Sequence, residues 1–227
     1  MGLNKRLISP AAAASSDVDP LNDSSGLALY KLDGNSNDDG GNYNGTWSGT
    51  TRYTTGQLGQ AAEFVGSTAD YISLPTNFGY ANNSFSISFW LANTKTSGNG
   101  YAISSIGTNT SCHGNLHLGR KDTGKFLFAW FCNDLQSSTN ITTNGTWQHW
   151  TCTYNASTNT RKIYLNSIQD ANDTPGSDYI GTENIQIGGS TYWFGQNNAY
   201  QGYIDQVRFF NKELTSSEVS TIYLLDQ

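Results

Sequence analysis

Charged residues are scarce in this chain, and basic ones are the scarcer kind. Only 13% of the 227 residues are charged, with 12 Lys and Arg against 18 Asp and Glu, for a formal net charge of −6. A nucleic-acid surface needs a clustered basic footprint, so this composition argues against nucleic-acid binding. No apolar run approaches the roughly 18 residues that a membrane-spanning helix requires. We therefore expect neither nucleic acid as a partner nor membrane insertion.

Motifs of hydrolases, nucleotide-binding proteins and zinc proteins are also missing. His113, His117 and His149 are the only histidines, and the chain has no Cys-x-x-Cys pair and no cluster of Cys and His with zinc-site spacing. It has no Gly-x-Ser-x-Gly nucleophile elbow and no P-loop. We therefore expect no catalytic residues.

The chain has three cysteines, which cannot all pair with one another. Cys112 comes just before an expected strand over 115–120, and Cys132 ends the expected partner strand over 125–132. An antiparallel register brings these two ends together, so a Cys112–Cys132 disulfide is geometrically reasonable. The reduced pair fits the sequence equally well. Cys152 reads as a small core residue.

Aromatic residues and glycines are abundant, and they indicate an all-β fold. Aromatics make up 13% of the chain and there are 24 glycines, while Ser, Thr, Asn and Gly fill the spaces between short apolar runs. The expected strands cover 27–32, 61–65, 71–74, 84–89, 101–106, 115–120, 125–132, 147–154, 161–166, 184–187 and 203–210. We expect 61–65 to pair with 71–74, and 121–124 to form a hairpin turn. Two antiparallel sheets packed face to face would bury these strands.

The last strand and the helix after it are the most explicit part of the pattern. Strict alternation puts Tyr203, Asp205, Val207 and Phe209 on one face, expected to point inward. Thr215 and a glutamate three residues later form a capping box, which predicts a short C-terminal helix.

Residues 1–25 form a separate segment with no strand period. They contain Lys5, Arg6, Pro10 and an alanine run over 11–14. Pro10 interrupts the apolar stretch early, which disfavours a secretory signal. We predict an extended N-terminal arm over 1–25 and one β-sandwich domain over 26–227. The arm resembles short leaders of structural proteins of marine tailed phages.

Six ordered segments of the sandwich resemble the laminin-G-like jelly-roll family of the concanavalin A-like lectin/glucanase superfamily. They are Leu29–Asp38, Gln57–Phe64, Phe85–Trp90, Trp147–His149, Lys162–Asn166 and Gly202–Val219. The resemblance implies a two-sheet jelly roll that usually binds ligands and rarely cleaves them. Retaining glucanases of the superfamily carry paired carboxylates close together on one strand. This chain has only four glutamates, and none has such a partner, so we expect no enzyme activity.

A structural Ca²⁺ site is the cofactor that the sequence favours. Asp33, Asn35, Asp38 and Asp39 crowd a loop after the first strand, and Ca²⁺ prefers hard oxygen ligands of this kind. Asp205 would join them if the first and last strands run side by side, because a carboxylate on an inward face needs a cation or several donors. The alternative is a solvated turn rich in Asp and Asn, with Asp205 bound to an arginine or to backbone amides.

A ligand-binding surface is predicted in the loop before the last strand. Tyr192, Trp193, Phe194, Gln196 and Asn197 form it. Three consecutive aromatics cannot all point inward, and aromatic rings beside amides suit the apolar face and hydroxyl rim of a sugar. The alternative is a loop that folds over the sandwich edge or contacts another subunit. Tyr200 reads as a core residue.

Together these features predict a non-catalytic protein of a phage particle. The arm would attach it to capsid or tail proteins in an oligomeric assembly, and the lectin-like sandwich would be displayed for adhesion or for binding host glycans. The alternative is a free, secreted bacterial carbohydrate-binding module.

Overall fold

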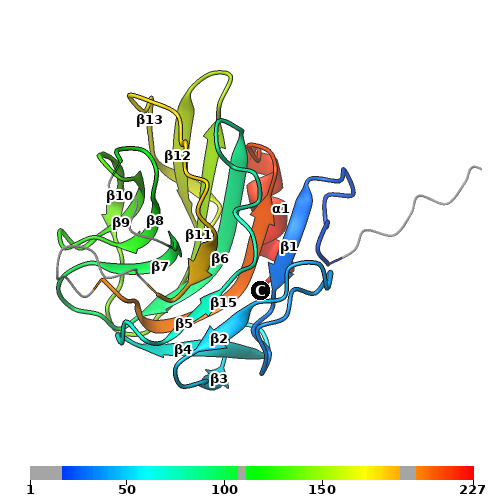
Figure 1. The fold of residues 1–227 in the computed structure, drawn as a ribbon, viewed down its shortest axis with the longest axis vertical. Helices are drawn as coiled ribbons and strands as arrows, with labels where there is room; N and C mark the ends of the chain where they lie inside the picture. Colours follow the sequence, from blue (N-terminus) through cyan, green and yellow to red (C-terminus); the bar gives the residue numbers. More distant parts are fainter. Residues whose placement is uncertain (1–16, 107–110, 190–197) are drawn as a thin grey trace, which may run out of the picture.

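The computed structural model describes residues 17–106, 111–189 and 198–227. In these residues two antiparallel sheets pack face to face, and a single short helix, α1 (Ser216–Leu225), follows the last strand (Figure 1). The predicted all-β sandwich with one C-terminal helix is confirmed. No helix in the described residues is long and apolar enough to cross a membrane.

The larger sheet has eight strands in the order β13-β12-β11-β6-β15-β4-β3, with β1 also paired to β15. Their bounds are β1 Gly26–Tyr30, β3 Tyr53–Thr55, β4 Gln60–Val65, β6 Phe85–Asn93, β11 Trp147–Asn155, β12 Thr160–Leu165, β13 Ile168–Asp173 and β15 Gln201–Phe210.

The smaller sheet has seven strands in the order β10-β9-β8-β7-β14-β5-β2. Their bounds are β2 Thr46–Ser48, β5 Tyr71–Ser73, β7 Gly100–Ser105, β8 Leu116–Arg120, β9 Lys125–Trp130, β10 Asn133–Asn140 and β14 Ile185–Ile187. The expected hairpin is present: β8 pairs with β9, and in the turn between them the amide of Gly124 donates to the carbonyl oxygen of Lys121.

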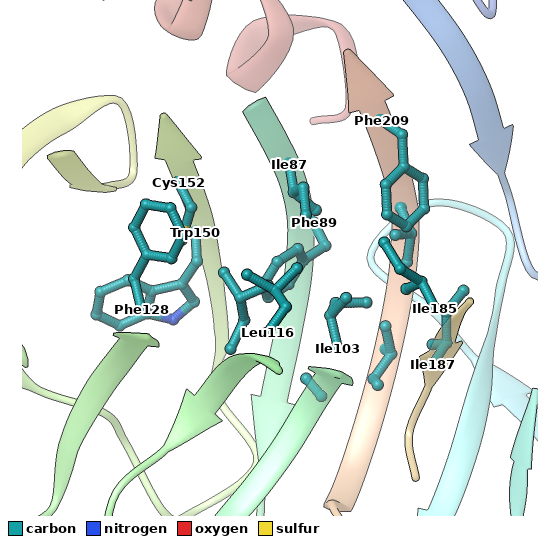
Figure 2. Close-up of a cluster of buried hydrophobic side chains, with 14 of the residues drawn as sticks. Ile87, Phe89, Ile103, Leu116, Phe128, Trp150, Cys152, Ile185, Ile187 and Phe209 are labelled. Atoms are coloured by element: carbon teal, nitrogen blue, oxygen red, sulfur yellow. The ribbon is translucent and has the colours of Figure 1, made fainter. Parts of the chain in front are cut away.

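The core lies between the two sheets. Figure 2 shows Phe89 and Trp150 of the eight-stranded sheet pointing toward Leu116 and Phe128 of the seven-stranded sheet. The period-two alternation of the strands produces this layer, because every second side chain points inward. Cys152 is buried in the same cluster, as the sequence predicts.

The C-terminal segment covers part of the outer face of the eight-stranded sheet. Ser86 and Ser88 of β6 alternate with the core residues Phe85, Ile87 and Phe89 and so point outward, but both are buried. Ser86 Oγ donates to the carbonyl oxygen of Lys212 and accepts from the amide of Leu214. Thr215 caps α1 in the predicted capping box with Glu218. The small serines thus leave room for the turn and helix to dock.

The expected pairing of 61–65 with 71–74 is wrong. β4 pairs with β15 and β3 in one sheet, whereas β5 pairs with β14 and β2 in the other. Both segments have a buried face, and the residues between them connect the two sheets instead of turning back in one. Sequence proximity suggested a hairpin, but the need to bury both faces against the opposite sheet decided the topology.

Strict alternation along the last strand is also wrong, because β15 contains a bulge. Its pairing with β6 shifts between Asp205 and Arg208, and Gln206 has a left-handed backbone with a φ of 48°. Ile204 and Val207, three residues apart, both point into the core. Asp205 pairs with Trp90 and lies on the outer face instead of the inner one. The extra residue in the bulge moves the side chains that precede it along β15 to the opposite face from the one that strict alternation predicts.

Residues 17–25, assigned from the sequence to the arm, lie against the sandwich. Asp17 forms an ion pair with Lys31, and Asp23 pairs with Lys212. Leu21 packs against the cluster beneath α1. The described part of the arm therefore contributes contacts to the folded domain.

A disulfide joins Cys112 and Cys132, whose Cα atoms are 5.2 Å apart. Cys112 precedes β8, and Cys132 lies between β9 and β10. Of the two states that the sequence left open, the structure has the bridged one.

Candidate functional site

The predicted aromatic ligand loop lies outside the described residues. Tyr192, Trp193, Phe194, Gln196 and Asn197 all belong to the range 190–197. The residues on either side attach to β7: Gly188 donates to the carbonyl oxygen of Ala102, and Tyr101 donates to that of Asn198. Tyr200 is fully buried in the core, as expected.

The outer face of the seven-stranded sheet carries an aromatic pair beside these two attachment points. Tyr101 and His117 stack with ring centroids 4.6 Å apart, next to the small cluster of Leu127 and Ala129. Burial lowers the pKa of His117 to about 4, so its imidazole is neutral at pH 7. Tyr101 is only 6% exposed. The described part of this face therefore offers little open ring surface to a ligand.

In the acidic loop after β1, most of the predicted metal ligands already form hydrogen bonds or ion pairs within the protein. Asp38 is buried, and its carboxylate accepts from the amides of Leu29, Gly40, Asn42 and Tyr43.

Asp39 pairs with Lys31 at 3.0 Å, and Asn35 forms a local turn with Asp33 and Asn37. These contacts match the alternative of a turn rich in Asp and Asn, although Asp38 within it is buried and not solvated. In the described ranges no group of three His, Cys, Asp or Glu is placed to hold a metal ion.

Asp33 and Asp205, the other two predicted ligands, meet on the turn after β3. Asp33 Oδ1 accepts from the amide of Gln60 at 2.6 Å, and Asp205 Oδ2 accepts from that of Leu58 at 3.0 Å. The turn comes this close because Gly59 has no side chain: a Cβ there would lie 2.3 Å from Asp33 Oδ1. The expected approach of the first loop to the last strand is therefore real.

Asp205 is fully buried, and its Oδ1 has no hydrogen-bond partner among the described residues. Burial raises its pKa to about 7, and the negative charge of Asp33 adds to the rise, while nearby backbone amides oppose it. An unpartnered buried carboxylate oxygen beside a second carboxylate is a feature that a cation would satisfy. Two of the five predicted ligands thus lie near one another, and the calcium site stays a prediction.

Four neighbouring strands of the eight-stranded sheet place one residue each in a row on its outer face. Trp147 of β11 pairs with Ala92 of β6, Ala92 with Tyr203 of β15, and Tyr203 with Glu63 of β4. The residues next to them along the strands, such as Leu91 and Ile204, point into the core. The row therefore points away from the core. We call Trp147, Ala92, Tyr203 and Glu63 the aromatic row.

The aromatic row presents two rings with a small residue between them. The ring centroids of Trp147 and Tyr203 are 6.4 Å apart, and their planes differ by 47°. Both rings are half-buried, as is Glu63, whereas Ala92 is fully buried. Exposed Gln201 and Val65 form the next pair along the same strands. Such a surface offers apolar ring faces, a carboxylate and an amide to a ligand.

Sequence reasoning missed the aromatic row, although a signal was present. Trp147 was read only as part of a family strand motif, and Tyr203 was assigned to the inner face. Alternation from the buried Trp150 places Trp147 outside. For Tyr203, the bulge at Gln206 hid the correct facing. Applying the alternation along 147–154 would therefore have predicted Trp147, one of the two rings, on the outer face.

The chain matches a known protein family, but it matches no curated protein sequence. The family model described as the concanavalin A-like lectin/glucanases superfamily matches residues 66–220. This range includes β6, β11 and β15. No curated protein matches the chain.

Solved structures share the fold at low sequence identity. One is domain 4 of AbnA, an extracellular GH43 arabinanase from Geobacillus stearothermophilus, in complex with arabinotriose, with 21% identity, a TM-score of 0.71, and coverage of 86% of this chain and 97% of that chain. Another is botulinum neurotoxin type C, whose cell entry depends on interaction with two ganglioside molecules. It has 17% identity and a TM-score of 0.68, and the match covers 91% of this chain and 52% of that chain. A third is Trypanosoma rangeli sialidase in complex with the inhibitor DANA, with 14% identity, a TM-score of 0.66, and coverage of 88% of this chain and 33% of that chain.

At these identities the likeness shows a shared lectin-like β-sandwich fold. This chain spans about half of the neurotoxin chain and a third of the sialidase chain.

Proposed function

Because the chain belongs to the concanavalin A-like lectin/glucanases superfamily, we propose that it is a non-catalytic carbohydrate-binding domain. The aromatic row is the observation that carries this proposal. Sugar rings have an apolar face that packs on aromatic side chains, and hydroxyl groups that bond to carboxylates and amides. Trp147 and Tyr203 supply the ring faces, and Glu63 and Gln201 supply the polar groups.

The charge of the surface favours a neutral glycan. Glu63 is a carboxylate within the aromatic row, and the chain has a formal net charge of −6. A polyanionic glycan would meet like charge there, which costs affinity. The row also crosses four neighbouring strands on an outer sheet face, which suits a stretch inside a polysaccharide chain. That an arabinotriose complex exists for a domain of the same fold makes linear arabinan a sensible first probe.

The surroundings of Glu213, Glu218 and Asp205 support binding without cleavage. Glu213 bonds to Lys162 and Asn155, and Glu218 belongs to the capping box. Asp205 has a raised pKa, as a general acid would, but its side chain is fully buried beneath the turn after β3. A general acid must reach the leaving-group oxygen of its substrate. We therefore propose no role for these groups in hydrolysis.

Affinity electrophoresis with linear arabinan and a panel of neutral polysaccharides tests the proposal. We expect Trp147→Ala and Tyr203→Ala each to weaken binding about tenfold, equivalent to about 1.4 kcal/mol. Ile168→Ala is the matched control, because Ile168 is 73% exposed on another strand of the same sheet. Retention of full affinity in both aromatic variants would show that the row is not the binding surface.

We also propose Ca²⁺ as a structural ion held by Asp33 and Asp205. The unpartnered Oδ1 of Asp205 beside Asp33 supports it. Bound there, Ca²⁺ would supply positive charge to a buried carboxylate and would tie the turn after β3 to β15. It would have no part in a reaction.

The setting that we propose is a phage particle, with attachment to capsid or tail proteins through the N-terminal arm. Its support is the composition of residues 1–25, with Lys5 and Arg6 ahead of an alanine run. A free secreted module remains the alternative. Particles assembled with a chain that begins at Asp17 distinguish the two: loss of incorporation with a folded sandwich supports attachment, and unchanged incorporation excludes it.

A further inference from the structure

A cavity of about 380 Å³ opens on the outer side of the eight-stranded sheet, where the two ends of the described chain meet. Its lining includes Asp17 near the N-terminal end and Asp226 near the C-terminal end. Leu58 and Leu225 also line it, and they are 43% and 50% exposed. The cavity is distinct from the aromatic row, none of whose residues line it.

The cavity lies at a split in the sheet. On one side of β15, β4 pairs with its first part up to Ile204, and β1 pairs with its second part from Val207. Asp205 and Gln206 lie between these two ladders and pair with neither strand. The bulge thus opens a gap between β1 and β4, and Gln206 is among the residues that line the cavity. Bulges at such positions often redirect a side chain toward a functional site.

The backbone and the amide of Gln206 are both unusual. Its φ of 48° is a left-handed conformation that non-glycine residues rarely adopt. Its side chain is 1% exposed, and Nε2 has no hydrogen-bond partner in the described residues. An unpartnered buried amide is costly unless something accepts from it.

The cationic groups of the lining are already neutralised. Arg208 forms a two-point ion pair with Asp226 and donates to the carbonyl oxygen of Asp17. Lys31 pairs with Asp17 at 2.8 Å and with Asp39 at 3.0 Å. An anionic ligand would therefore find no free positive charge in the described part of the lining.

The remaining groups suit hydroxyl groups on a small apolar frame. Among the described residues no cation pairs with Asp33, so its carboxylate can accept from a ligand hydroxyl. The amide of Gln206 is buried and unpartnered in the described residues, and it would donate to a ligand hydroxyl once its side chain turns toward the cavity. Leu58 and Leu225 offer apolar contact at the rim. The volume lies at the lower end of the range for small-ligand pockets, roughly 300–1,000 Å³.

We propose that this cavity binds a single neutral sugar residue or a polyol of similar size, independently of the aromatic row. Its hydroxyls would donate to Asp33 and accept from Gln206, and its carbon frame would contact Leu58 and Leu225. The ion pairs that already occupy Lys31 and Arg208 disfavour an anionic ligand.

NMR titration of the full chain with methyl glycosides of neutral hexoses and pentoses, and with glycerol, tests the proposal. We expect saturable shifts at Leu58, Gln206 and Leu225 with at least one of these probes. Leu225→Arg should abolish them by placing a large charged side chain at the rim. Leu224→Arg is the matched control: Leu224 is the neighbouring residue, is 66% exposed, and does not line the cavity. Gln206→Gly removes the amide, fits the left-handed backbone, and should weaken binding about tenfold, or about 1.4 kcal/mol.

Two outcomes would overturn this inference. One is the absence of saturable shifts with every sugar and polyol probe, including the case in which an alkylammonium salt alone gives shifts and assigns the cavity to a cation. The other is shifts that persist in Leu225→Arg, which would place the ligand elsewhere. Trp147→Ala should leave these shifts intact, so failure of the aromatic row and failure of the cavity are separate results.

Discussion

Single buried polar side chains hold distant parts of this sandwich together. Arg161 is fully buried, with its guanidinium 4.4 Å from the ring centroid of Trp130. It pairs with Asp173 at 2.6 Å and donates to the carbonyl oxygen of Asn133. It thereby links β12 to β13 and to the start of β10 in the other sheet. Leaving one member of such a pair alone in the interior costs about 3–5 kcal/mol.

His149 should make the domain sensitive to mild acid. It lies on the outer face beneath α1, with a ring nitrogen 2.8 Å from Ser88 Oγ and its ring beside Tyr223. Burial lowers its pKa from 6.5 to about 3, and the charge of Arg208 adds to the effect. The imidazole thus stays neutral in the folded state while it gains a proton in the unfolded state. Its contribution to stability is present above pH 6.5 and is lost as the pH falls toward 3.

We expect the wild type to lose about 2 kcal/mol of unfolding free energy through His149 between pH 7 and pH 5. Urea denaturation of His149→Gln should show a correspondingly smaller loss, because glutamine does not titrate. Ser88→Ala is the control, since it removes the hydrogen bond but keeps the imidazole. Equal pH dependence in wild type and His149→Gln would assign the acid sensitivity to other groups.

Asp205 gives a second test at this scale, through metal removal. After EDTA treatment, Asp205→Asn should be at least as stable as the wild type at pH 8, because it removes a buried charge whose Oδ1 has no partner in the part of the chain that the structure describes. Added Ca²⁺ should raise the melting temperature of the wild type by mass action and leave that of the variant unchanged. A wild type that does not respond to Ca²⁺ after chelation would rule out the metal at this position.

The limits of prediction are clearest at these residues. The sequence placed Asp33 near Asp205 correctly, because it predicted that the loop after the first strand approaches the last strand. It placed Asp205 on the wrong face, because the left-handed Gln206 shifts the register by one residue. Glutamine carries no local signal for such a backbone, unlike glycine or asparagine. The bulge arises where β15 changes its partner from β4 to β1, and this pairing depends on residues far away in the sequence.

At the scale of elements, the apolar strands were predictable and the polar ones were not. β6 and β11 are buried along nearly all their length, and their apolar residues predict both strands. β10 and β13 are mostly exposed or half-buried edge strands made largely of Asn, Asp, Gln, Ser and Thr. Their strand conformation depends on hydrogen bonds to β9 and β12 and not on intrinsic preference.

The disulfide should stabilise the hairpin of β8 and β9. Cys112 and Cys132 are 20 residues apart and enclose both strands. Closing a loop of this size contributes about 3 kcal/mol, mainly by restricting the unfolded chain. We expect the double variant Cys112→Ser and Cys132→Ser to lose about that amount in chemical denaturation. Reductant should lower the stability of the wild type and leave the double variant unchanged; insensitivity of both would mean that the bridge adds nothing.

At the scale of the whole molecule, the N-terminal segment 17–25 completes the domain. Asp19 accepts from the amide of Gly26, Leu21 joins the cluster beneath α1, and Asp23 pairs with Lys212. Asp17 meets both Lys31 and Arg208. The boundary at residue 25, drawn from composition, cuts through these contacts.

A chain that begins at Asp17 should therefore be more stable than one that begins at Gly26. We expect the shorter chain to melt lower by about 5 °C or more, since each 1 kcal/mol shifts the melting temperature by roughly 2–4 °C in a domain of this size. Circular dichroism should show the same strand content for both. Identical melting temperatures would mean that residues 17–25 only rest on the surface.

Arg208 contacts Asp17 from one end of the described chain and Asp226 from the other, so the path of the backbone is almost a closed ring. A short linker between these two ends would make it one, and the chain could then be opened elsewhere, for instance in the exposed turn at Asp122, without changing which strands are neighbours. Such a circular permutant would hold its two new ends on the β8–β9 hairpin of the seven-stranded sheet. Fusion partners or surface attachment points could then be moved to the opposite sheet from the aromatic row, which leaves that row accessible for assays on an immobilised protein.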